Sequence, residues 1–167
     1  MTEPGFRELR VWQGGMELAE AVYRLTASFP RHETYGLSSQ IQRAAVAVPA
    51  NVAEGQCRDH LPEYIRFVSI ARGSLAEVDT HLELAVRLTY VSRGDATPLF
   101  DRIAVLARQL TTLRQRLKER LEQQEQARRA PAPPNPQSPI PNPQSPIPNP
   151  QSQLAPEARC SNPSPTA

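Results

Sequence analysis

Apolar residues recur at spacings of three and four positions along most of residues 1–130, and this spacing predicts α-helices. No stretch alternates apolar and polar residues for long, so the pattern does not favour β-strands. Four helical segments are expected, at about residues 8–28, 38–54, 59–91 and from 97 to beyond 121. Short links make consecutive helices antiparallel neighbours. The predicted fold class is therefore all-α, an antiparallel up-and-down four-helix bundle.

The apolar stripes also predict which side chains fill the core. The first segment has one stripe of Leu9, Trp12, Met16, Ala19 and Tyr23, and a second of Leu18, Val22, Leu25 and Phe29. The seam of the third segment contains Leu61, Tyr64, Val68, Ala71, Leu75, Val78, Leu82 and Ala85. The seam of the fourth contains Leu99, Ile103, Leu106, Leu110, Leu113, Leu117 and Leu121.

Prolines and polar residues suggest where the helices begin and bend. Pro49 lies inside the second segment, where it should kink the helix and free the carbonyl of Ala45. Asp59 is expected to cap the third segment. Thr97 followed by Pro98 is expected to open the fourth segment, as a cap with proline at the first helical position.

Composition separates a second region from the bundle. Of 18 prolines, 13 fall from Pro131 onward, and the heptapeptide Asn-Pro-Gln-Ser-Pro-Ile-Pro occurs at 135–141 and again at 142–148. Such a sequence offers few apolar groups to offset the entropy of ordering. We therefore expect a bundle domain over 1–130 and a disordered tail over 131–167. The tail is either a ligand for a proline-binding domain or an expanded repeat without a partner.

The charge balance does not by itself identify a partner. The net charge is only +2, yet 18 of the 19 basic residues are arginines, with Lys118 the exception. From Asp101 to Ala130 there are eight basic residues against four acidic ones. The residues expected to bind RNA or DNA are Arg7, Arg10, Arg24, Arg58, Arg66 and Arg72. In a ring of identical subunits even a modest cluster repeats, which strengthens the local potential.

The third segment carries small residues where long charged ones are expected. This strip, opposite the seam, contains Ser69, Gly73, Ala76 and Thr80. Gly73 costs about 1 kcal/mol relative to alanine in a helix, so a compensating reason for it is expected. Close approach of a second helix would supply one, and we predict an oligomer interface at these four positions. The alternative is a solvated strip of small residues.

The densest group of polar residues lies around the predicted kink. Gln40 and Asn51 fall on or near the apolar face of the second segment, and Glu54 could bind Arg58 or Arg72. A buried amide must be paired with a hydrogen-bonding partner. We interpret Gln40, Asn51 and Glu54 as a structural polar lock that fixes the register of the second and third helices. A recognition site is the alternative interpretation.

No motif in the chain supports catalysis or metal binding. None of the three histidines follows a glutamate at the three-residue spacing used by di-iron bundles. Phosphate-binding glycine loops and nucleophile elbows are absent from the sequence. We expect no enzyme activity, no cofactor and no metal. Two distant cysteines, no signal peptide and no membrane-length apolar run predict a cytoplasmic protein without a membrane partner.

Several motifs between residues 6 and 120 together carry a resemblance. They are F-x-x-L-x-V-W from Phe6, F-P-x-x-E-x-Y-G-L-x-x-Q from Phe29, R-A-x-x-x-V-P-A-N-V-A-E-G from Arg43, E-Y-x-R-F from Glu63 and A-R-G-S-x-x-E from Ala71. These motifs resemble the four-helix-bundle family of 23S rRNA intervening-sequence proteins. A departure such as alanine at position 47, where the family commonly has serine, does not threaten the fold.

The resemblance implies a fold and an assembly more than an activity. The family is similar to the accessory variability protein of diversity-generating retroelements, a barrel-shaped homopentamer that binds nucleic acid and its reverse transcriptase. By this resemblance we expect a homo-oligomer, a pentamer, that binds RNA, DNA or a nucleic-acid enzyme such as a reverse transcriptase. No catalytic residues are implied. The alternative is a structural or adaptor protein that binds a protein partner and has no nucleic-acid role.

Overall fold

The structure, a computed structural model, describes residues 5–129, and the chain divides into two units after Ala130. The described residues form four α-helices and no strand: α1 (Arg10–Thr26), α2 (Leu37–Gln56), α3 (Leu61–Arg87) and α4 (Arg93–Arg129). Two short 3-10 helices, η1 (Phe6–Glu8) and η2 (Arg31–Glu33), precede α1 and α2. The all-α fold class is therefore confirmed. The tail predicted to be disordered, 131–167, lies outside the described residues.

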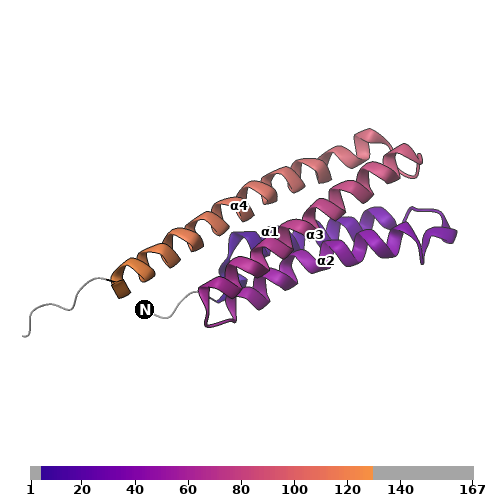
Figure 1. Cartoon of the computed structure of the whole chain (residues 1–167). Helices are drawn as coiled ribbons and strands as arrows, with labels where there is room; N and C mark the ends of the chain where they lie inside the picture. The colour runs from indigo at the N-terminus through magenta and orange to yellow at the C-terminus, as the bar shows by residue number, and fades with distance from the viewer. Residues whose placement is uncertain (1–4, 130–167) are drawn as a thin grey trace, which may run out of the picture. The chain divides into compact units, whose positions relative to one another are not determined.

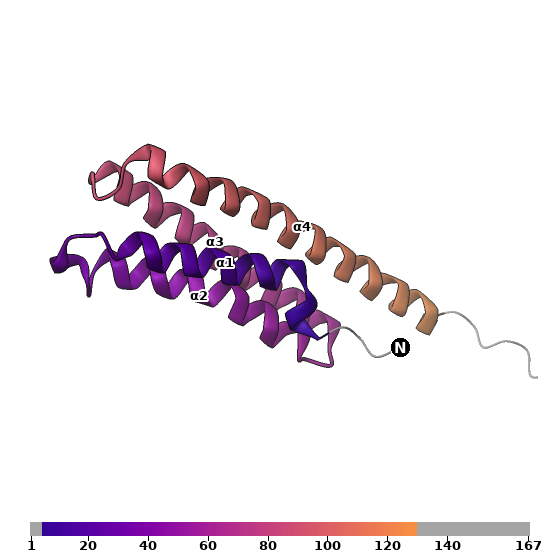
Figure 2. The ribbon, with the colours of Figure 1, turned by 180° about the vertical axis from the view of Figure 1, so that it is seen from behind.

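Each helix packs against two others, as in an up-and-down bundle. Helix α1 contacts α2 and α4, and α3 contacts α2 and α4, with the most extensive contact between α2 and α3. Consecutive helices run antiparallel (Figures 1 and 2). The predicted four-helix bundle is thus confirmed, with α4 as its longest member.

The core follows the seams predicted for α3 and α4. Every seam residue of α3 from Val68 to Ala85 is buried, and the seam of α4 is buried from Leu99 to Leu117 except at the half-buried Leu113. The spacing of three and four residues therefore identifies the inner faces of both helices correctly.

Helix α1 turns a different face inward from the one that its first stripe predicts. Met16 and Tyr23 are 46% and 51% exposed, so assigning them to the core is wrong. Gly15 is buried instead, because Pro49 of α2 packs against its backbone. A Cβ atom on Gly15 would lie 3.2 Å from Pro49 Cβ. The second stripe, in contrast, is confirmed: Leu18, Val22 and Phe29 are buried and Leu25 is half-buried, with Leu18 and Val22 on the same face of α1 as Gly15.

Helix α4 begins one turn earlier than predicted. The hydroxyl of Ser92 accepts a hydrogen bond from the Asp95 backbone N–H at 3.1 Å and donates one to the Asp95 carboxylate at 2.6 Å. This reciprocal cap places Pro98 at the sixth position of the helix. Thr97, the predicted cap, lies inside α4 and its hydroxyl donates to the Arg93 carbonyl at 2.8 Å.

The cap of α3 also differs from the prediction. The N-cap residue is His60, not Asp59, and its side chain makes no capping hydrogen bond. The first turn of α3 therefore begins without a side-chain acceptor for its backbone N–H groups.

One end of the bundle, called the closed end here, consists of the loops 27–36 and 88–92. Glu33 joins the two loops, since its carboxylate accepts hydrogen bonds from the Leu37 backbone N–H at 2.7 Å and from the Tyr90 hydroxyl at 3.0 Å. The first bond caps α2, and the second links the α1–α2 loop to the α3–α4 turn.

The opposite end, called the open end here, consists of residues 5–9, the α2–α3 turn at 57–60 and the last turns of α4 at 118–129. Helix α4 has 37 residues and α3 has 27, which makes α4 about 15 Å longer. Figures 1 and 2 show this extra length running past the α2–α3 turn.

Candidate nucleic-acid interface

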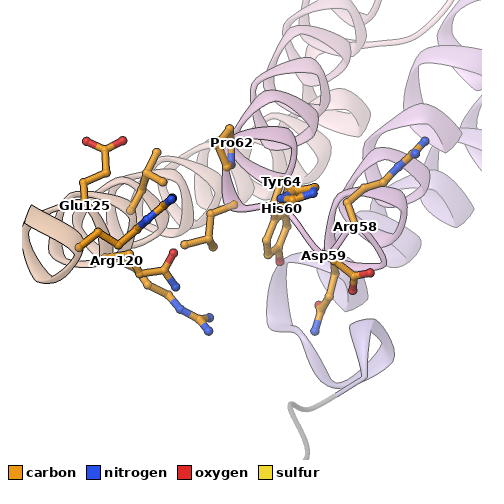
Figure 3. Close-up of a pocket in the computed structure, with 12 residues that line it drawn as sticks. Arg58, Asp59, His60, Pro62, Tyr64, Arg120 and Glu125 are labelled. Carbon is orange, nitrogen blue, oxygen red and sulfur yellow. The ribbon is translucent and has the colours of Figure 1, made fainter.

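A pocket of about 500 Å³ lies at the open end, between the α2–α3 turn and the last turns of α4. His60 from the turn and Tyr64 from α3 line one side. Arg120 and Arg128 from α4 line the other, together with Glu125. Figure 3 shows Glu125 pointing away from His60 and Tyr64. The pocket therefore combines the guanidinium groups of two α4 residues, Arg120 and Arg128, with the N-terminus of α3.

The start of α3 contributes to the electrostatics of this pocket. Pro62 has no backbone N–H, and His60 provides no side-chain cap, so the remaining amides of the first turn carry the positive end of the helix dipole. Asp59 also lines the pocket and offsets part of that charge. Such an arrangement can accept an anionic oxygen, as phosphate groups do at helix N-termini.

Arg58 lines the same pocket but is already engaged by neighbouring side chains. Its guanidinium lies 2.7 Å from the Glu54 carboxylate, 4.0 Å from that of Glu63 and 5.4 Å from the centre of the Phe67 ring. The hydrogen bond to Glu54, followed by the charge of Glu63, raises the pKa of Arg58. Figure 3 shows its guanidinium directed away from His60. Arg58 therefore connects the end of α2 to the start of α3.

The three residues of the predicted polar lock make mainly local contacts. Gln40 is exposed, so placing it on or near the apolar face is wrong. The amide of the half-buried Asn51 donates to the Ala47 carbonyl at 2.7 Å, not to the Ala45 carbonyl that Pro49 frees. Glu54 is exposed and takes part in the contact between α2 and α3 through Arg58.

The six predicted arginines do not form one surface. Arg7 and Arg10 lie at or beside the open end, and Arg66 lies in the second turn of α3 near the same end. Arg72 is close to the middle of α3. Arg24 lies in the last turn of α1, next to the closed end, and forms an ion pair with a glutamate of its own helix.

Most arginines near the closed end are paired with carboxylates, whereas Arg31 in the α1–α2 loop forms no ion pair among residues 5–129. Glu83 lies 3.0 Å from Arg87 and 2.8 Å from Arg93, and Arg102 lies 2.9 Å from Glu17. The hydrogen bond from Arg93, followed by that from Arg87, lowers the pKa of Glu83. The charge of Arg102 is therefore compensated by Glu17, and Glu83 compensates one of the two charges of Arg87 and Arg93.

Several arginines toward the open end differ in this respect, although Arg58 is paired with Glu54. Among residues 5–129, no carboxylate forms an ion pair with Arg7, Arg10 or Arg66. The same holds for Arg128, which lines the pocket. The sequence indicates the excess of arginines in α4 but does not single out Arg120 or Arg128, because their meeting with the α2–α3 turn depends on the length of α4.

The strip predicted as an oligomer interface lies on the outer face of α3. Gly73, Ala76 and Thr80 are exposed and Ser69 is half-buried. A Cβ atom on Gly73 would have no neighbour within 4 Å. Leu84 lies one turn beyond Thr80 and is 43% exposed. No described segment of the chain covers Gly73, so the interface stays a prediction about a second copy.

The described residues hold neither a metal-binding cluster nor a membrane-spanning helix. Between residues 5 and 129, no group of three or more histidine, cysteine, aspartate or glutamate side chains is arranged to hold a metal ion. None of the four described helices combines the length and apolar character needed to cross a membrane.

Comparison with known proteins identifies the family. The model of the 23S rRNA-intervening sequence protein family matches residues 7–112. Among solved structures, the chain is similar to a protein of unknown function from the S23 ribosomal protein family of Bacteroides thetaiotaomicron, with 21% identity and a TM-score of 0.56. That similarity covers 62% of this chain and 96% of the other, and it supports the fold. No curated protein matches. The chain belongs to the 23S rRNA-intervening sequence protein family.

Proposed function

We propose that this member of the 23S rRNA-intervening sequence protein family is a non-enzymatic homo-oligomer that binds RNA or DNA through the open end of its bundle. The observation that carries the proposal is the difference in arginine pairing. Arg24, Arg87, Arg93 and Arg102 are held by carboxylates, whereas Arg66 and others toward the open end are not. Neither the family nor the structurally similar protein is described as an enzyme.

Uncompensated guanidinium groups are suited to the phosphate backbone of nucleic acids. Arginine forms bidentate, charge-assisted hydrogen bonds to phosphate oxygens, and each neutralised phosphate releases a counterion. The pocket beside the start of α3 adds Arg128 to this surface and offers backbone N–H groups as further donors. Contacts to phosphates position the nucleic acid but do not distinguish one base from another. The expected binding is therefore salt-dependent and weakly sequence-specific.

Association of several copies would repeat the few arginines of one chain and so produce a larger positively charged surface for nucleic acid. The exposed strip of Ser69, Gly73, Ala76 and Thr80 is the face through which we propose that copies pack. A pentamer is the assembly that the family resemblance implies. Each copy then contributes the same arginines, and the positive potential increases with the number of subunits.

The nucleic-acid part of the proposal is tested by paired substitutions. Arg7→Gln combined with Arg66→Gln should weaken retention of RNA and DNA on filters. It should also reduce the slope of log affinity against log salt by about two, because each arginine is expected to neutralise one phosphate. Arg24→Gln is the matched control and should leave retention unchanged, because Arg24 is paired with Glu20. Equal loss in both variants, or no salt-dependent retention by the unchanged protein, would contradict the proposal.

The assembly part is tested at Gly73. Gly73→Leu should reduce the mass measured by light scattering to that of a smaller species while the helical circular dichroism signal stays the same. The expectation rests on the free space around Gly73 within one chain. An unchanged mass, or a mass of one chain for the unsubstituted protein, would count against the interface.

A further inference from the structure

A groove runs along the joint between α1 and α4. It consists of two adjoining hollows of about 480 Å³ and 370 Å³, which share Arg10, Val105 and Gln109 in their linings. Along α4 the lining extends from Asp101 to Arg116. The groove therefore follows α4 for more than four helical turns.

The floor of this groove is apolar, and Val105, Leu9 and Leu113 are its solvent-accessible part, whereas Val11 and Leu106 are buried. It is formed by aliphatic side chains of both helices, Leu9 and Val11 from the α1 side and Val105, Leu106 and Leu113 from α4. Val105 is 44% exposed, although it lies between two packed helices. When an apolar side chain covers exposed aliphatic surface, that surface is removed from water and the free energy of binding becomes more favourable.

The rim of the groove carries charge that the chain does not compensate. Arg10, Arg108 and Arg116 line the larger hollow, and Glu8 is the acidic residue beside them. Within residues 5–129 none of these three arginines forms an ion pair with a carboxylate. At the other end of the groove, by contrast, Arg102 is paired with Glu17 at 2.9 Å. The unpaired charge is therefore concentrated in the larger hollow.

We propose that this groove binds an acidic amphipathic helix of a protein partner. Apolar side chains spaced three and four residues apart would cover Val105 and Leu113, and carboxylates beside them would pair with Arg108 and Arg116. Arginine recognises carboxylates through two parallel hydrogen bonds, which sets the orientation of the bound helix. This partner site goes beyond the proposed function and rests on different side chains, apart from Arg10.

The lining favours a peptide over a nucleic acid. Sequence-tolerant binding of single strands uses aromatic side chains on which bases stack, and none of the residues lining either hollow is aromatic. An aliphatic floor would also remove water from phosphates without replacing its hydrogen bonds. Carboxylates on a helix, in contrast, can stay at the rim while the apolar face fills the floor.

The probe for the test is a synthetic peptide of about 16 residues, matched to the length of the α4 lining. It carries leucines at positions i, i+3, i+4 and i+7 and glutamates on the flanking positions, and a scrambled peptide of the same composition is the control. Fluorescence anisotropy with the full chain should show saturable binding of the amphipathic peptide and at least tenfold weaker binding of the scrambled one. Equal binding of the two peptides would overturn the proposal.

Two matched pairs of variants locate the site. Val105→Glu should weaken peptide binding at least tenfold, whereas Val46→Glu, at an equally exposed valine of α2 outside the groove, should not. Arg108→Glu with Arg116→Glu should weaken binding most at low salt, and Arg43→Glu on α2 should have little effect. Circular dichroism checks that each variant is folded. Equal losses within either pair would overturn the proposal.

Two other occupants of the groove are separable outcomes. If Val105→Glu lowers the mass of the assembly in light scattering, a second copy of the chain occupies the groove and the peptide proposal is wrong. If polyuridine displaces the peptide and Val105→Glu weakens both ligands equally, the groove is a nucleic-acid site and the proposal is also wrong. Loss of peptide binding in Val105→Glu, with mass and nucleic-acid retention unchanged, supports the partner site and leaves the proposed function intact.

Discussion

The two ends of the bundle are held together in different ways. At the closed end, side chains meet through specific polar contacts: Glu33 binds the start of α2 and Tyr90, and Ser92 caps α4. At the open end, α2 and α3 meet through steric fit, because Gly55 leaves space for Tyr64 and Phe67. The contact at Arg58 reinforces this corner.

This difference determines which charges are available to a ligand. Near the closed end the carboxylates of Glu17, Glu20 and Glu83 are used by arginines of the chain itself. Toward the open end, Arg10, Arg66 and Arg128 form no ion pair with a carboxylate of residues 5–129, so their charges are not compensated in that way. Because the α2–α3 contact at Gly55 depends on the fit of apolar side chains, it does not use the charges of nearby arginines, which can bind a ligand instead.

The largest expected change in stability is at the open end. In Gly55→Ala the new Cβ atom would lie 2.8 Å from Phe67 Cβ and from Tyr64 Cδ2, so α3 must shift. Overpacking of this kind lowers the free energy of unfolding by about 1–3 kcal/mol. Urea unfolding followed by circular dichroism measures it.

Gly14→Ala is the matched control for that substitution. Its new Cβ atom would lie 3.5 Å from Leu106 Cδ1, an ordinary van der Waals contact, and the change should raise the free energy of unfolding by up to about 1 kcal/mol through helix propensity. If both alanines stabilised the protein, the open end would not depend on steric fit.

A smaller loss is expected where α4 starts. Ser92→Ala removes the acceptor for the Asp95 backbone N–H and should cost about 1 kcal/mol. Thr97→Ala, in contrast, should change the thermal midpoint little, since Thr97 lies inside the helix and its hydroxyl only donates to the Arg93 carbonyl. A larger effect at Thr97 than at Ser92 would place the helix start one turn later.

The smallest change is expected at Glu33 and depends on pH. Hydrogen bonds from the Leu37 backbone N–H and then from Tyr90 lower the pKa of Glu33 below its ordinary value of 4.5. The ionised carboxylate therefore stabilises the fold above that ordinary pKa, and the contribution is lost as pH falls through the lowered pKa of the folded state. Glu33→Gln should unfold at lower urea than the unchanged chain at pH 7, and the difference should shrink toward pH 3. A difference that is independent of pH would show that the charge of Glu33 is not involved.

Helical spacing predicts much of this fold because the relevant contacts repeat along each helix. The seams of α3 and α4 are long and regular, so both the helices and their inner faces follow from the sequence. Helix α1 shows the limit of this reasoning, since its sequence has two apolar stripes and only the packing shows that the stripe of Leu18 and Val22 faces inward, whereas Met16 and Tyr23 of the other stripe are exposed. The start of α4 is hard to predict because Thr97-Pro98 and Ser92 are competing signals, and the reciprocal bond with Asp95 favours Ser92.

The candidate sites are less predictable than the fold. The hydrogen bond between Glu33 and Tyr90 joins residues 57 positions apart, so no local spacing reveals it. Arg108 and Arg116 belong to the arginine-rich part of α4 that the sequence indicates, but only packing against α1 places them beside Arg10. Charge composition therefore indicates that arginines are abundant, whereas their pairing depends on the arrangement of the helices.

The contact between Glu33 and Gly36 couples two positions in any variant of this chain. A Cβ atom on residue 36 would overlap the carboxylate that caps α2. A larger residue at 36 is therefore compatible with the fold only if residue 33 shortens or moves at the same time, and the α2 cap is then given up. Among diverging descendants of this sequence, a larger residue at 36 should therefore occur only together with a change at 33, whereas residue 33 can change while Gly36 stays.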